Sequence, residues 1–447
     1  MRIFCSGIGG IGLSAYASLQ AKRGHRVSGS DRAQTPLTDA LGNLGIEVFY
    51  DQTGAALSKK VDLLVYSEAI PESAPERTRA HELSIPQQSY PQAIGALANG
   101  SKLIAVCGTH GKSSTTAMTA RLLMESGLDP TVVVGTKMKE LDGKNWRAGK
   151  SEWFILEACE YRRSFHCYSP QIILLTNADG DHFDYYTSKD DYRSAFVDFV
   201  RTLPADGLLI THRSDPDCAA IAEESRRPVL DADSFPLIPL QTPGLHMRQN
   251  AQLVLALAHH LGIPSAESQK IVSQFSGSWR RIEIKSTRAD GITVIDDYAH
   301  HPREIRATIA AVKDQFPGRR LVCVFQPHTH DRTIKLYEDF LECFTGVGRL
   351  IVTNIYDARS DIETNHVDGA KFSEDIAARS RIHTTFGRSL GETERVLREE
   401  VLKSGDVLLC LGAGDVTNLA TEMVGEKLQD PRFQTPDNSS RDQGSRI

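Results

Sequence analysis

Two glycine-rich segments constrain this chain more than any other feature of its sequence. Gly7-Ile-Gly-Gly-Ile-Gly12 follows a short apolar run at 2–6, and Gly108-Thr-His-Gly-Lys-Ser113 follows another at 103–107. A strand that turns through glycines into a helix presents its backbone N–H groups at the helix N-terminus, where anions bind. Each segment therefore predicts a strand–loop–helix unit that holds a phosphate group.

The segment at 108–113 carries the stronger signal. A helix is expected over 114–126, Lys112 can reach the outer phosphates, and the Ser113 hydroxyl can ligate a divalent cation. The strict P-loop spacing has glycine at position 106, where Val106 stands, so the segment is a variant, and an ordinary glycine turn is the alternative. The pattern predicts ATP binding by Gly108, Thr109, His110, Gly111, Lys112, Ser113 and Ser114.

The first segment is similar to a dinucleotide-binding loop, because Asp31 follows the second expected strand, nineteen residues beyond Gly12. Its glycines could equally serve a tight turn and close strand–helix packing. Two separate nucleotide loops in one chain favour ATP together with a nucleotide-linked substrate. A dinucleotide-dependent oxidoreductase is an alternative that leaves the second loop unexplained.

The organisation of the chain is that of an α/β protein. At about 150 residues per domain, 447 residues predict three domains, and β-branched runs alternate with helical stretches as they do in parallel sheets covered by helices. We expect a Rossmann-like domain at 1–97, a central P-loop-type ATPase domain with a mostly parallel sheet at 98–284, a Rossmann-like C-terminal domain at 285–428 and a disordered tail at 429–447. The expected strands are 2–6, one ending near 30–31, 61–66, 103–107, 153–158, 172–176, 292–296, 321–325, 350–353 and 407–411, and the expected helices include 11–23, 248–261, 302–315, 332–343 and 392–403.

Composition excludes several classes of protein. Lys and Arg number 51 against 57 Asp and Glu, so no basic surplus is present to pair with a nucleic-acid polymer. The eight cysteines are scattered without a C-x-x-C pair, which predicts reduced thiols. Neither a signal-peptide core nor an apolar run approaching 18 residues is present. We therefore expect a cytoplasmic protein that does not need a membrane.

Carboxylates follow two strands expected beside the nucleotide loop. Glu157 ends the strand at 153–158, and Asp179, Asp181, His182 and Asp184 follow the strand at 172–176. Carboxyl ends of parallel strands share one edge of a sheet, and Mg²⁺ prefers oxygen ligands. Glu157 is a candidate metal ligand, and any of the other four could complete the site, although His182 could also be a helix cap or surface residue.

Histidines and aspartates gather after two strands of the third block. Asp296-Asp-Tyr-Ala-His-His-Pro302 and Gln326-Pro-His-Thr-His-Asp-Arg332 each follow an apolar run. Such a set could bind a transition metal, with Asp296, His300, His301 and His328 in a metallohydrolase. Turns with helix caps are the other interpretation.

In its ordered series of motifs, the chain resembles the Mur ligases of peptidoglycan synthesis. Among the members of that family, it is most similar to those that add alanine. The resemblance spans residues 1 to about 425 and rests on GIGGIGLS at 7–14, GSD at 29–31, YSEAIP at 66–71, GTHGKSSTT at 108–116, EACEYRRSF at 157–165, TNADGDHFD at 176–184, PGLHMRQN at 243–250, WRRIE at 279–283, DDYAHHPRE at 296–304, FQPHTHDRT at 325–333 and LGAGD at 411–415.

The resemblance implies an ATP-dependent cell-wall ligase with three domains. Its N-terminal domain would bind UDP-N-acetylmuramate, its central domain would bind ATP and Mg²⁺, and its C-terminal domain would close over the site with L-alanine. The lactyl carboxylate would take the γ-phosphoryl group, and the amine of L-alanine would displace phosphate from the acyl phosphate. No obligate protein partner is implied. A relative that attaches a preformed peptide to the same UDP-sugar shares nearly every motif and stays open.

Carried over by motif, the resemblance also assigns individual residues. Ser113, Glu157 and His182 would ligate the metal, and Lys112, Glu157, His182, His301 and Arg332 would be catalytic. Asn250 and Arg281 would contact ATP or its phosphates, with Tyr298, His301, His328 and Arg332 facing the nucleotide and amino acid. Gly9, Gly10 and Gly12 would approach the diphosphate of the UDP-sugar, with Ser30, Asp31 and Ser67 near the uridine.

Three positions depart from the family pattern. Met247 stands where the family has Asn, which removes one adenine hydrogen bond, and Thr329 stands where Arg is common, which removes a phosphate contact unless His330 substitutes. Cys159 replaces a common Asp in a form of the motif that also occurs in the family.

Overall fold

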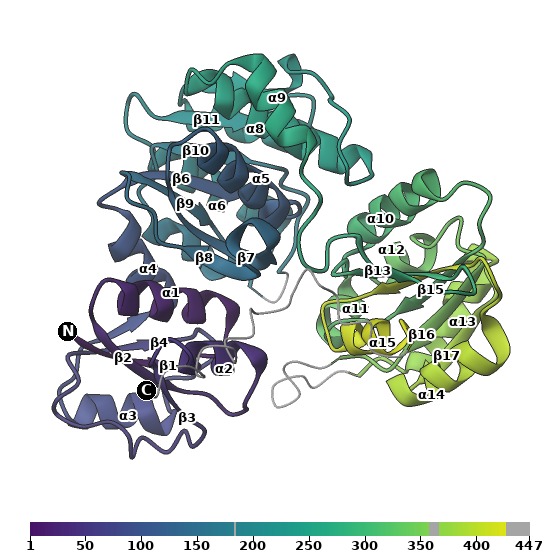
Figure 1. Ribbon diagram of the computed structural model, residues 1–447, viewed down its shortest axis with the longest axis horizontal. Helices are drawn as coiled ribbons and strands as arrows, with labels where there is room; N and C mark the ends of the chain where they lie inside the picture. The colour runs from purple at the N-terminus through teal and green to yellow at the C-terminus, as the bar shows by residue number, and fades with distance from the viewer. Residues whose placement is uncertain (183–184, 357–365, 426–447) are drawn as a thin grey trace, which may run out of the picture. The chain divides into compact units, whose positions relative to one another are not determined.

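The structure is a computed structural model that describes residues 1–182, 185–356 and 366–425. The chain divides into two compact units, coloured along the sequence in Figure 1. Unit 1 contains Met1–Lys137 and Lys144–Ser278, and unit 2 contains Met138–Gly143 and the chain from Trp279 onward. The expected tail at 429–447 and the candidate Asp184 lie outside the described residues.

The first sheet of unit 1 is parallel throughout and has the strand order β3-β2-β1-β4-β5. The chain runs outward from β1 to β3 and then returns to β4 on the other side of β1. The strand order therefore reverses between β1 and β4, and the carboxyl ends of strands at such a switch point are where α/β proteins bind ligands. The elements are β1 Arg2–Ser6, α1 Ile11–Lys22, β2 Arg26–Ser30, α2 Pro36–Gly42, β3 Glu47–Phe49, β4 Leu63–Tyr66, α3 Pro75–Glu82, β5 Gln87–Ser89 and α4 Tyr90–Ala98.

The second sheet of unit 1 has the order β12-β11-β10-β6-β9-β7-β8, with β6 between β9 and β10. Strand β6 is buried on both faces from its second residue on, as expected for a central parallel strand with a continuous apolar run. The elements are β6 Lys102–Cys107, α5 Lys112–Glu125, β7 Thr131–Met138, β8 Lys144–Arg147, β9 Trp153–Glu157, η2 Tyr161–Cys167, β10 Ile172–Leu175, α6 Lys189–Arg201, β11 Leu208–Thr211, α7 Pro216–Ser225, β12 Val229–Asp231, η3 Ala232–Ser234, α8 Leu245–His260 and α9 Ser265–Ser273. Between β7 and β8, η1 Lys139–Leu141 belongs to the short segment assigned to unit 2.

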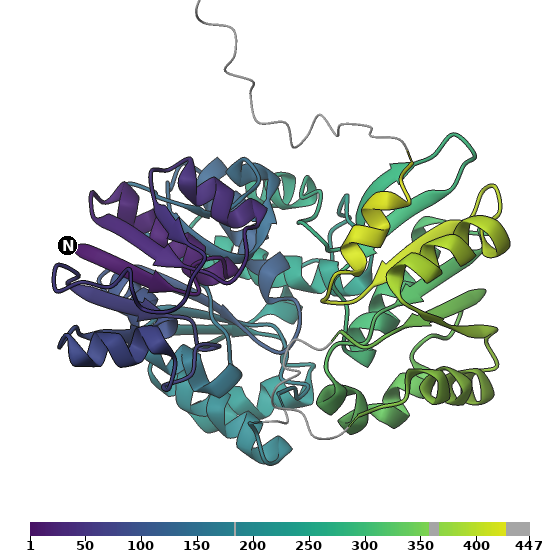
Figure 2. The same cartoon turned by 90° about the horizontal axis from the view of Figure 1, so that it is seen from below.

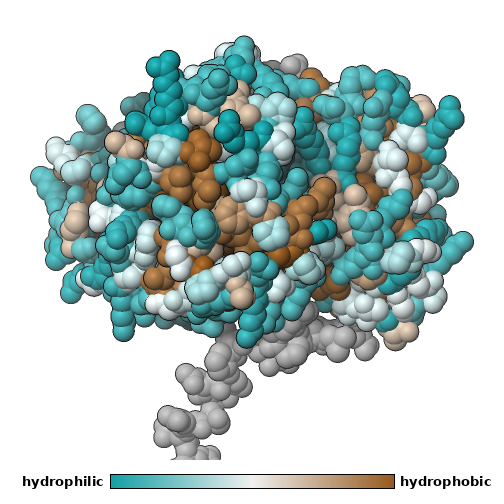
Figure 3. All heavy atoms as spheres, turned by 90° about the horizontal axis from the view of Figure 1, so that it is seen from above, coloured by the Kyte–Doolittle hydropathy of each residue, from teal (hydrophilic) through white to brown (hydrophobic). Residues whose placement is uncertain are grey.

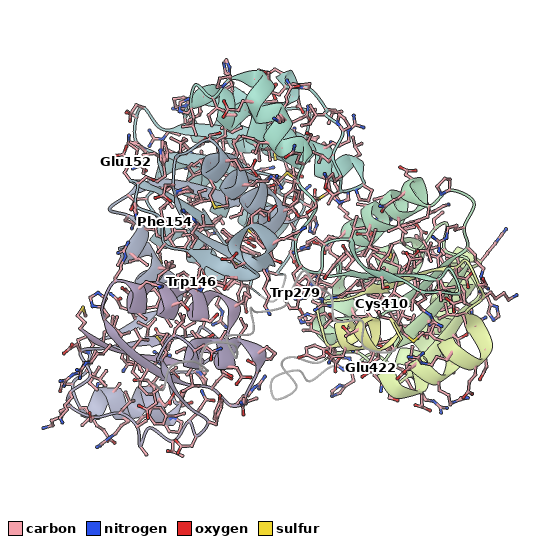
Figure 4. All side chains as sticks on the ribbon, viewed as in Figure 1. Trp146, Glu152, Phe154, Trp279, Cys410 and Glu422 are labelled. Atoms are coloured by element: carbon pink, nitrogen blue, oxygen red, sulfur yellow. The ribbon has the colours of Figure 1, made fainter. Side chains whose placement is uncertain are left out.

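One hydrophobic core joins the two sheets of unit 1. Ile94 and Ala98 of α4 belong to the same buried cluster as Phe165 and Tyr168, which follow β9. Trp146 on β8 and Phe154 on β9, both labelled in Figure 4, are buried in that cluster. The predicted limit near residue 97 therefore falls inside a compact unit and stays a prediction.

Unit 2 contains a third sheet of order β13-β14-β18-β15-β16-β17, in which β13 is antiparallel to β14 and the other pairs are parallel. Helices lie on both faces of this sheet (Figure 2). The elements are β13 Glu283–Thr287, β14 Thr293–Asp297, α10 Pro302–Gln315, β15 Leu321–Phe325, α11 His330–Lys335, α12 Tyr337–Glu342, β16 Arg349–Thr353, α13 Gly369–Ser380, β17 Thr384–Arg388, α14 Leu390–Val396, the π-helical turn η4 Leu397–Val401, β18 Val407–Leu411 and α15 Val416–Glu422.

The α/β architecture predicted from the sequence is confirmed. Two expected helices are interrupted: the one over 332–343 is divided at Leu336 into α11 and α12, and the one over 392–403 changes to a π-helical turn at Leu397. Strand β13 starts at Glu283, so the chain has already entered the third sheet before the expected limit at 284.

The surface is mostly polar, and the cysteines are free thiols. Polar side chains cover most of the face shown in Figure 3, with apolar patches between them. None of the eight cysteines is in a disulfide, and Cys159 is exposed. Across the ranges that the structure describes, every helix is too short or too polar to span a membrane.

Candidate active site

The nucleotide loop between β6 and α5 is shaped by two glycines with positive φ. Gly108 has φ +134° and Gly111, the N-cap of α5, has φ +79°. A Cβ at position 108 would lie 2.0 Å from the Thr176 hydroxyl oxygen, so only glycine fits there. The loop thus brings its backbone to the N-terminus of α5, as predicted.

The segment after β10 holds this loop in place. The Asn177 carbonyl accepts from Thr109 N at 3.1 Å, and its side-chain oxygen accepts from His110 N at 2.9 Å. The Thr176 hydroxyl donates to the His110 carbonyl at 2.5 Å. The Thr109 hydroxyl is 2.8 Å from the hydroxyl of Tyr192 on α6. These contacts use the N–H groups of Thr109 and His110, and they hold the backbone of the loop in place before any phosphate arrives.

Lys112 lies folded over its own loop and is paired with a buried carboxylate. Its Nζ donates to the carbonyls of Gly108 at 2.5 Å and Thr109 at 3.0 Å, and it lies 2.9 Å from an oxygen of Glu160. Glu160 is fully buried. Burial alone would lower the pKa of Lys112, but the charge of Glu160 more than offsets this and raises it. Lys112 is thereby held as a cation.

Ser113 and Glu157, two of the predicted metal ligands, are brought together. The Ser113 hydroxyl donates to Oε1 of Glu157 at 2.9 Å, and Oε2 of Glu157 accepts from the backbone N–H of Gly135 on β7 at 2.6 Å. A hydroxyl and a carboxylate oxygen beside a phosphate-binding loop are the oxygen donors that Mg²⁺ prefers. These two residues fit a magnesium ion.

The third predicted ligand, His182, lies beside another carboxylate. Its Nε2 is 3.6 Å from Glu160 and 4.0 Å from Asp181, and its ring lies on Tyr161 with centroids 4.7 Å apart. Its backbone has φ +56°, which is uncommon for a residue with a side chain. Asp179 lies 3.7 Å from His110. The part of His182 in metal binding stays a prediction.

Helix α8 contacts the nucleotide loop through Asn250. A Cβ at Gly111 would lie 2.7 Å from the side-chain oxygen of Asn250, so this amide packs directly on the nucleotide loop. Met247, which departs from the family pattern, is buried one turn earlier in the same helix. Asn250 is thus beside the predicted ATP site. Ser114 is buried in the first turn of α5.

The first glycine loop lies at the switch point of the first sheet. Gly9 N donates to Asp31 Oδ2 at 2.8 Å, and a Cβ at Gly7 would lie 3.0 Å from Cβ of Ser67. Gly10 is the N-cap of α1. Ser30 is buried at the end of β2. The six residues predicted to bind the UDP-sugar therefore gather at one sheet edge, with Gly12 in the first turn of α1.

The residues predicted in unit 2 gather at the carboxyl ends of β14 and β15. The Arg281 guanidinium is 5.1 Å from the Tyr298 ring centroid, and Arg332 Nη1 is 3.2 Å from Nδ1 of His328. His300 lies between Tyr298 and His328, with ring centroids 5.3 Å and 5.7 Å away. This arrangement makes a row of rings and cations.

His301 and Thr329 serve as helix caps in this cluster. The Nδ1 atom of His301 accepts from Arg303 N at 3.3 Å at the start of α10. Thr329 is the N-cap of α11 with φ +63°, a strained conformation for a β-branched residue. Backbone strain of this kind is common at functional sites. The catalytic roles of His301 and Arg332 stay predictions.

Asp297 anchors the segment that enters unit 2. Its carboxylate accepts from Ile282 N at 2.6 Å and Ala299 N at 2.8 Å, and from the Thr308 hydroxyl at 3.2 Å. Burial raises its pKa to about 6, although Arg281 and the two backbone donors act in the opposite direction.

A small cavity of about 250 Å³ lies nearby in unit 2. It is lined by Gln326, Thr353, Asn354, Ile355, Tyr356, Arg388, Ser389, Leu390 and Asp415. The lining residues include Arg388, the last residue of β17, and Asp415, the N-cap of α15.

The alternative of a transition-metal hydrolase has no matching geometry. Asp296 contacts Arg280 at 3.4 Å and accepts from the Thr417 hydroxyl at 2.6 Å. Over the described ranges, no group of three or more His, Cys, Asp and Glu side chains is arranged to hold a metal ion.

Sequence reasoning missed three groups of this site: Glu160, the Thr176–Asn177 clamp and Gly135. Glu160 stands in the same motif as Glu157, and a second carboxylate three residues beyond the end of the strand is the signal that could have found it. The contact of Gly135 with Glu157 depends on strand pairing and leaves no local signal.

Comparisons with known proteins place the chain in one family. Residues 3–102 match "Mur ligase family, catalytic domain", residues 106–235 match "Mur ligase middle domain", and residues 280–414 match "Mur ligase, glutamate ligase domain". The UDP-N-acetylmuramate–L-alanine ligase of Clostridium novyi is 37% identical over 441 residues, covering 92% of this chain and 94% of that protein. The enzyme of the same name from Desulfitobacterium hafniense is 34% identical, covering 95% and 99%.

Solved structures agree over nearly the whole length. The UDP-N-acetylmuramate-alanine ligase of Thermotoga maritima has a TM-score of 0.79 at 27% identity, covering 95% of this chain and 98% of that one. A murein peptide ligase from Psychrobacter arcticus shares the fold, with a TM-score of 0.70 at 21% identity and coverage of 96% and 99%. The ordered motifs, the two glycine loops and these matches together show that this chain belongs to the Mur ligase family.

Proposed function

We propose that this chain joins L-alanine to the lactyl carboxylate of UDP-N-acetylmuramate with conversion of ATP to ADP and phosphate, a step of peptidoglycan synthesis. The observation that carries the proposal is the pair of nucleotide loops in unit 1, one at Gly7–Gly12 and one at Gly108–Ser113, each at the carboxyl edge of its sheet. The relatives named as L-alanine ligases support it.

The residues of the second loop fit phosphoryl transfer. The lactyl carboxylate attacks the γ-phosphorus, the bond to the β-phosphate oxygen breaks, and an acyl phosphate and ADP result. Negative charge develops on the transferred group, and the cationic Lys112 and the N–H groups at the start of α5 stabilise it. The Thr176–Asn177 clamp keeps these donors in position, so little reorganisation is needed.

Magnesium fits the oxygen donors of this loop. Ser113 and Glu157 would hold the ion, with Gly135 N orienting the carboxylate. A bound Mg²⁺ would supply positive charge to the phosphate oxygens. His182, with Glu160 beside it, is the further candidate ligand.

The second half-reaction needs an amine. The neutral amino group of L-alanine attacks the acyl carbon and a tetrahedral oxyanion forms. Phosphate then leaves with the C–O bond electrons, and the nitrogen releases one proton to solvent as the amide forms. In unit 2, the row formed by Arg281, Tyr298, His328 and Arg332 supplies the cations that stabilise such an oxyanion. We assign the 250 Å³ cavity to the amino acid, since Arg388 can pair with its carboxylate and Asp415 with its ammonium group before the amine is deprotonated for attack.

Phosphate release from Mg-ATP by the purified protein tests this function. The assay is run with and without UDP-N-acetylmuramate, across L-alanine, glycine, L-serine and the tripeptide L-Ala-γ-D-Glu-diaminopimelate, with the product mass measured in parallel. We expect release only when the UDP-sugar and L-alanine are both present, and a product heavier by one alanyl residue. A preference for the tripeptide would make the chain a peptide-recycling ligase, and release independent of the sugar would refute the proposal.

A further inference from the structure

Tyr90, which no motif singles out, lies between the two nucleotide loops. It is the first residue of α4, and it is half-buried. A Cβ at Gly12 would lie 2.7 Å from Cζ of Tyr90 and 2.9 Å from its hydroxyl oxygen, so the phenol covers the first turn of α1. This close approach requires glycine at position 12.

The Tyr90 phenol also interacts electrostatically with Glu157 and Cys159, beside the second nucleotide loop. Burial raises the pKa of Tyr90, and Glu157 and Cys159 raise it further. The hydroxyl therefore keeps its proton and is a permanent hydrogen-bond donor near the carboxylate assigned to the metal.

Helix α4 is held firmly where it places Tyr90. Its C-cap Asn99 donates to the Cys167 carbonyl at 3.1 Å and accepts from Ser169 N at 2.9 Å, both in the segment that follows β9. A Cβ at Gly95 would lie 2.5 Å from the Cys167 carbonyl oxygen. The Asn145 amide of β8 donates to the Ile11 carbonyl at 2.5 Å, which ties the first glycine loop to the second sheet. These contacts fix the position of Tyr90 between the two sheets of unit 1.

Its hydroxyl is not used by the protein itself. Over the described ranges, the Tyr90 oxygen has no hydrogen-bond partner, whereas the hydroxyl of the buried Tyr16 is bonded to Gln20 at 2.9 Å. A fixed donor without a partner, at the N-terminus of α1, suits an anionic acceptor from a ligand.

We propose that the Tyr90 hydroxyl donates a hydrogen bond to an anionic oxygen of the UDP-sugar, which makes Tyr90 a substrate-binding residue of this chain. The inference rests on the proposed function. The UDP-sugar offers two such acceptors: the diphosphate, expected at the first loop, and the lactyl carboxylate, which must reach the second.

The test is the affinity of Tyr90→Phe for three ligands measured by calorimetry: UDP, UDP-N-acetylglucosamine, which lacks the lactyl carboxylate, and UDP-N-acetylmuramate. A hydrogen bond to a charged group predicts a loss of roughly tenfold to a hundredfold. A loss for all three ligands assigns the contact to the diphosphate, and a loss for UDP-N-acetylmuramate alone assigns it to the carboxylate. Unchanged affinity for all three overturns the proposal.

Two controls separate this result from other causes. Tyr16→Phe removes a phenolic hydroxyl that is bonded within α1, and it should leave all three affinities unchanged. ADP binding by Tyr90→Phe should equal that of the natural chain, and a loss there would place the hydroxyl on ATP and overturn the proposal. If the natural chain binds none of the three ligands, the proposed function fails instead.

A second measurement does not depend on the stability of the variant. In protein labelled with ¹³C at tyrosine Cζ, the Tyr90 signal, assigned by its absence in Tyr90→Phe, should shift when UDP-N-acetylmuramate is added. A signal that stays in place at saturation contradicts the contact.

Discussion

At the scale of single residues, the main feature of the nucleotide loop is a buried pair of opposite charges. Lys112 and Glu160 form an ion pair whose side chains are 15% and 0% exposed. Removing one partner of such a pair leaves an uncompensated buried charge, which costs several kcal/mol. Loss of activity in a variant of Lys112 would therefore mix a chemical effect with a structural one, unless both are measured.

Lys112→Met should lower turnover by about a hundredfold or more, because the charge that stabilises the transferred phosphoryl group is lost. It should also destabilise the fold by about 3–5 kcal/mol, because Glu160 is left unpaired. The double variant Lys112→Met with Glu160→Gln should recover most of the stability and none of the turnover. Phosphate release and urea unfolding report the two effects.

The matched control for this pair is Lys102, which contacts Glu152 at 2.5 Å with side chains 51% and 61% exposed. Lys102→Met should change neither turnover nor stability appreciably, since exposed pairs contribute less than about 1 kcal/mol. Near-normal turnover in Lys112→Met would contradict the role assigned to Lys112.

Asp297 should make unit 2 less stable as the pH rises from 4 to 7. Its pKa is raised from the ordinary 3.8 to about 6, so the folded state binds the proton more tightly than the unfolded chain. The contribution is fully present below about pH 4 and is lost as the pH rises through 6; a shift of two units corresponds to about 3 kcal/mol. Asp297→Asn removes this titration.

The measurement is urea unfolding of the natural chain and Asp297→Asn at several pH values. Replacing Trp146 and Trp153 by Phe in both leaves Trp279, at the start of unit 2, as the fluorescent reporter. The difference in unfolding free energy between the two proteins should change by about 3 kcal/mol over this range. A difference that is constant with pH would contradict the assignment.

Sequence reasoning at this scale found the residues whose function requires a motif. The Ser113 hydroxyl of the loop donates to the strand-end carboxylate of Glu157 at 2.9 Å, so the two residues lie together as the motifs predict. Tyr90 was not found, because its place depends on how α4 packs against the segment after β9, a tertiary contact that no local pattern encodes.

At the scale of elements, the loop between β6 and α5 depends on two backbone conformations that only glycine adopts easily. Gly108 has both a positive φ and no room for a Cβ, whereas Gly127, just after α5, has φ +75° with no atom within 4 Å of a Cβ. Alanine at position 127 would suffer only backbone strain, whereas alanine at position 108 would suffer both strain and steric overlap, so comparing the two variants separates these effects.

Gly108→Ala should abolish measurable ADP binding, since its methyl group would overlap Thr176 and displace the clamp that holds the loop. Gly127→Ala should keep ADP affinity and lose only about 1 kcal/mol of stability through strain. Calorimetric titration with ADP and thermal melting compare the two. Binding by Gly108→Ala at the natural affinity would show that the loop tolerates displacement.

Strands with continuous apolar runs and helices with an amphipathic pattern were predictable from the sequence. Irregular breaks within helices were not. The strand at 321–325 and the helix at 302–315 have the expected limits, because buried parallel strands and amphipathic helices determine their own pattern. The break at Leu336 and the consecutive left-handed residues Arg162 and Arg163 correspond to no pattern in the local sequence.

At the scale of the whole molecule, the two nucleotide loops belong to one unit and the cationic row around Tyr298 to the other. Binding of the two nucleotides and completion of the reaction should therefore be separable by cutting the chain between the units.

A chain ending at Ser278 should fold and bind UDP-N-acetylmuramate with nearly natural affinity. It should still bind ADP through the loop at 108–113, but more weakly than the full chain because the predicted contacts from unit 2 are lost, and it should release no phosphate that depends on sugar and L-alanine. Unit 1 keeps both loops, while Arg281, Tyr298, His328 and Arg332 are removed. Calorimetry and phosphate release, with the full chain as reference, check this expectation. Ligation by the shortened chain would show that unit 2 is dispensable for chemistry.

The core that joins the first two sheets also bears on how chains of this family can diverge. Because Ile94 and Ala98 share buried neighbours with Phe165 and Tyr168, residues on the two sides of position 97 must change in concert. Exchange of the first 97 residues between related genes would bring together surfaces that were never selected to fit, and it would expose apolar groups. Recombination after Ser278 separates no such neighbours within unit 1, so that position is where we expect inherited blocks to be joined.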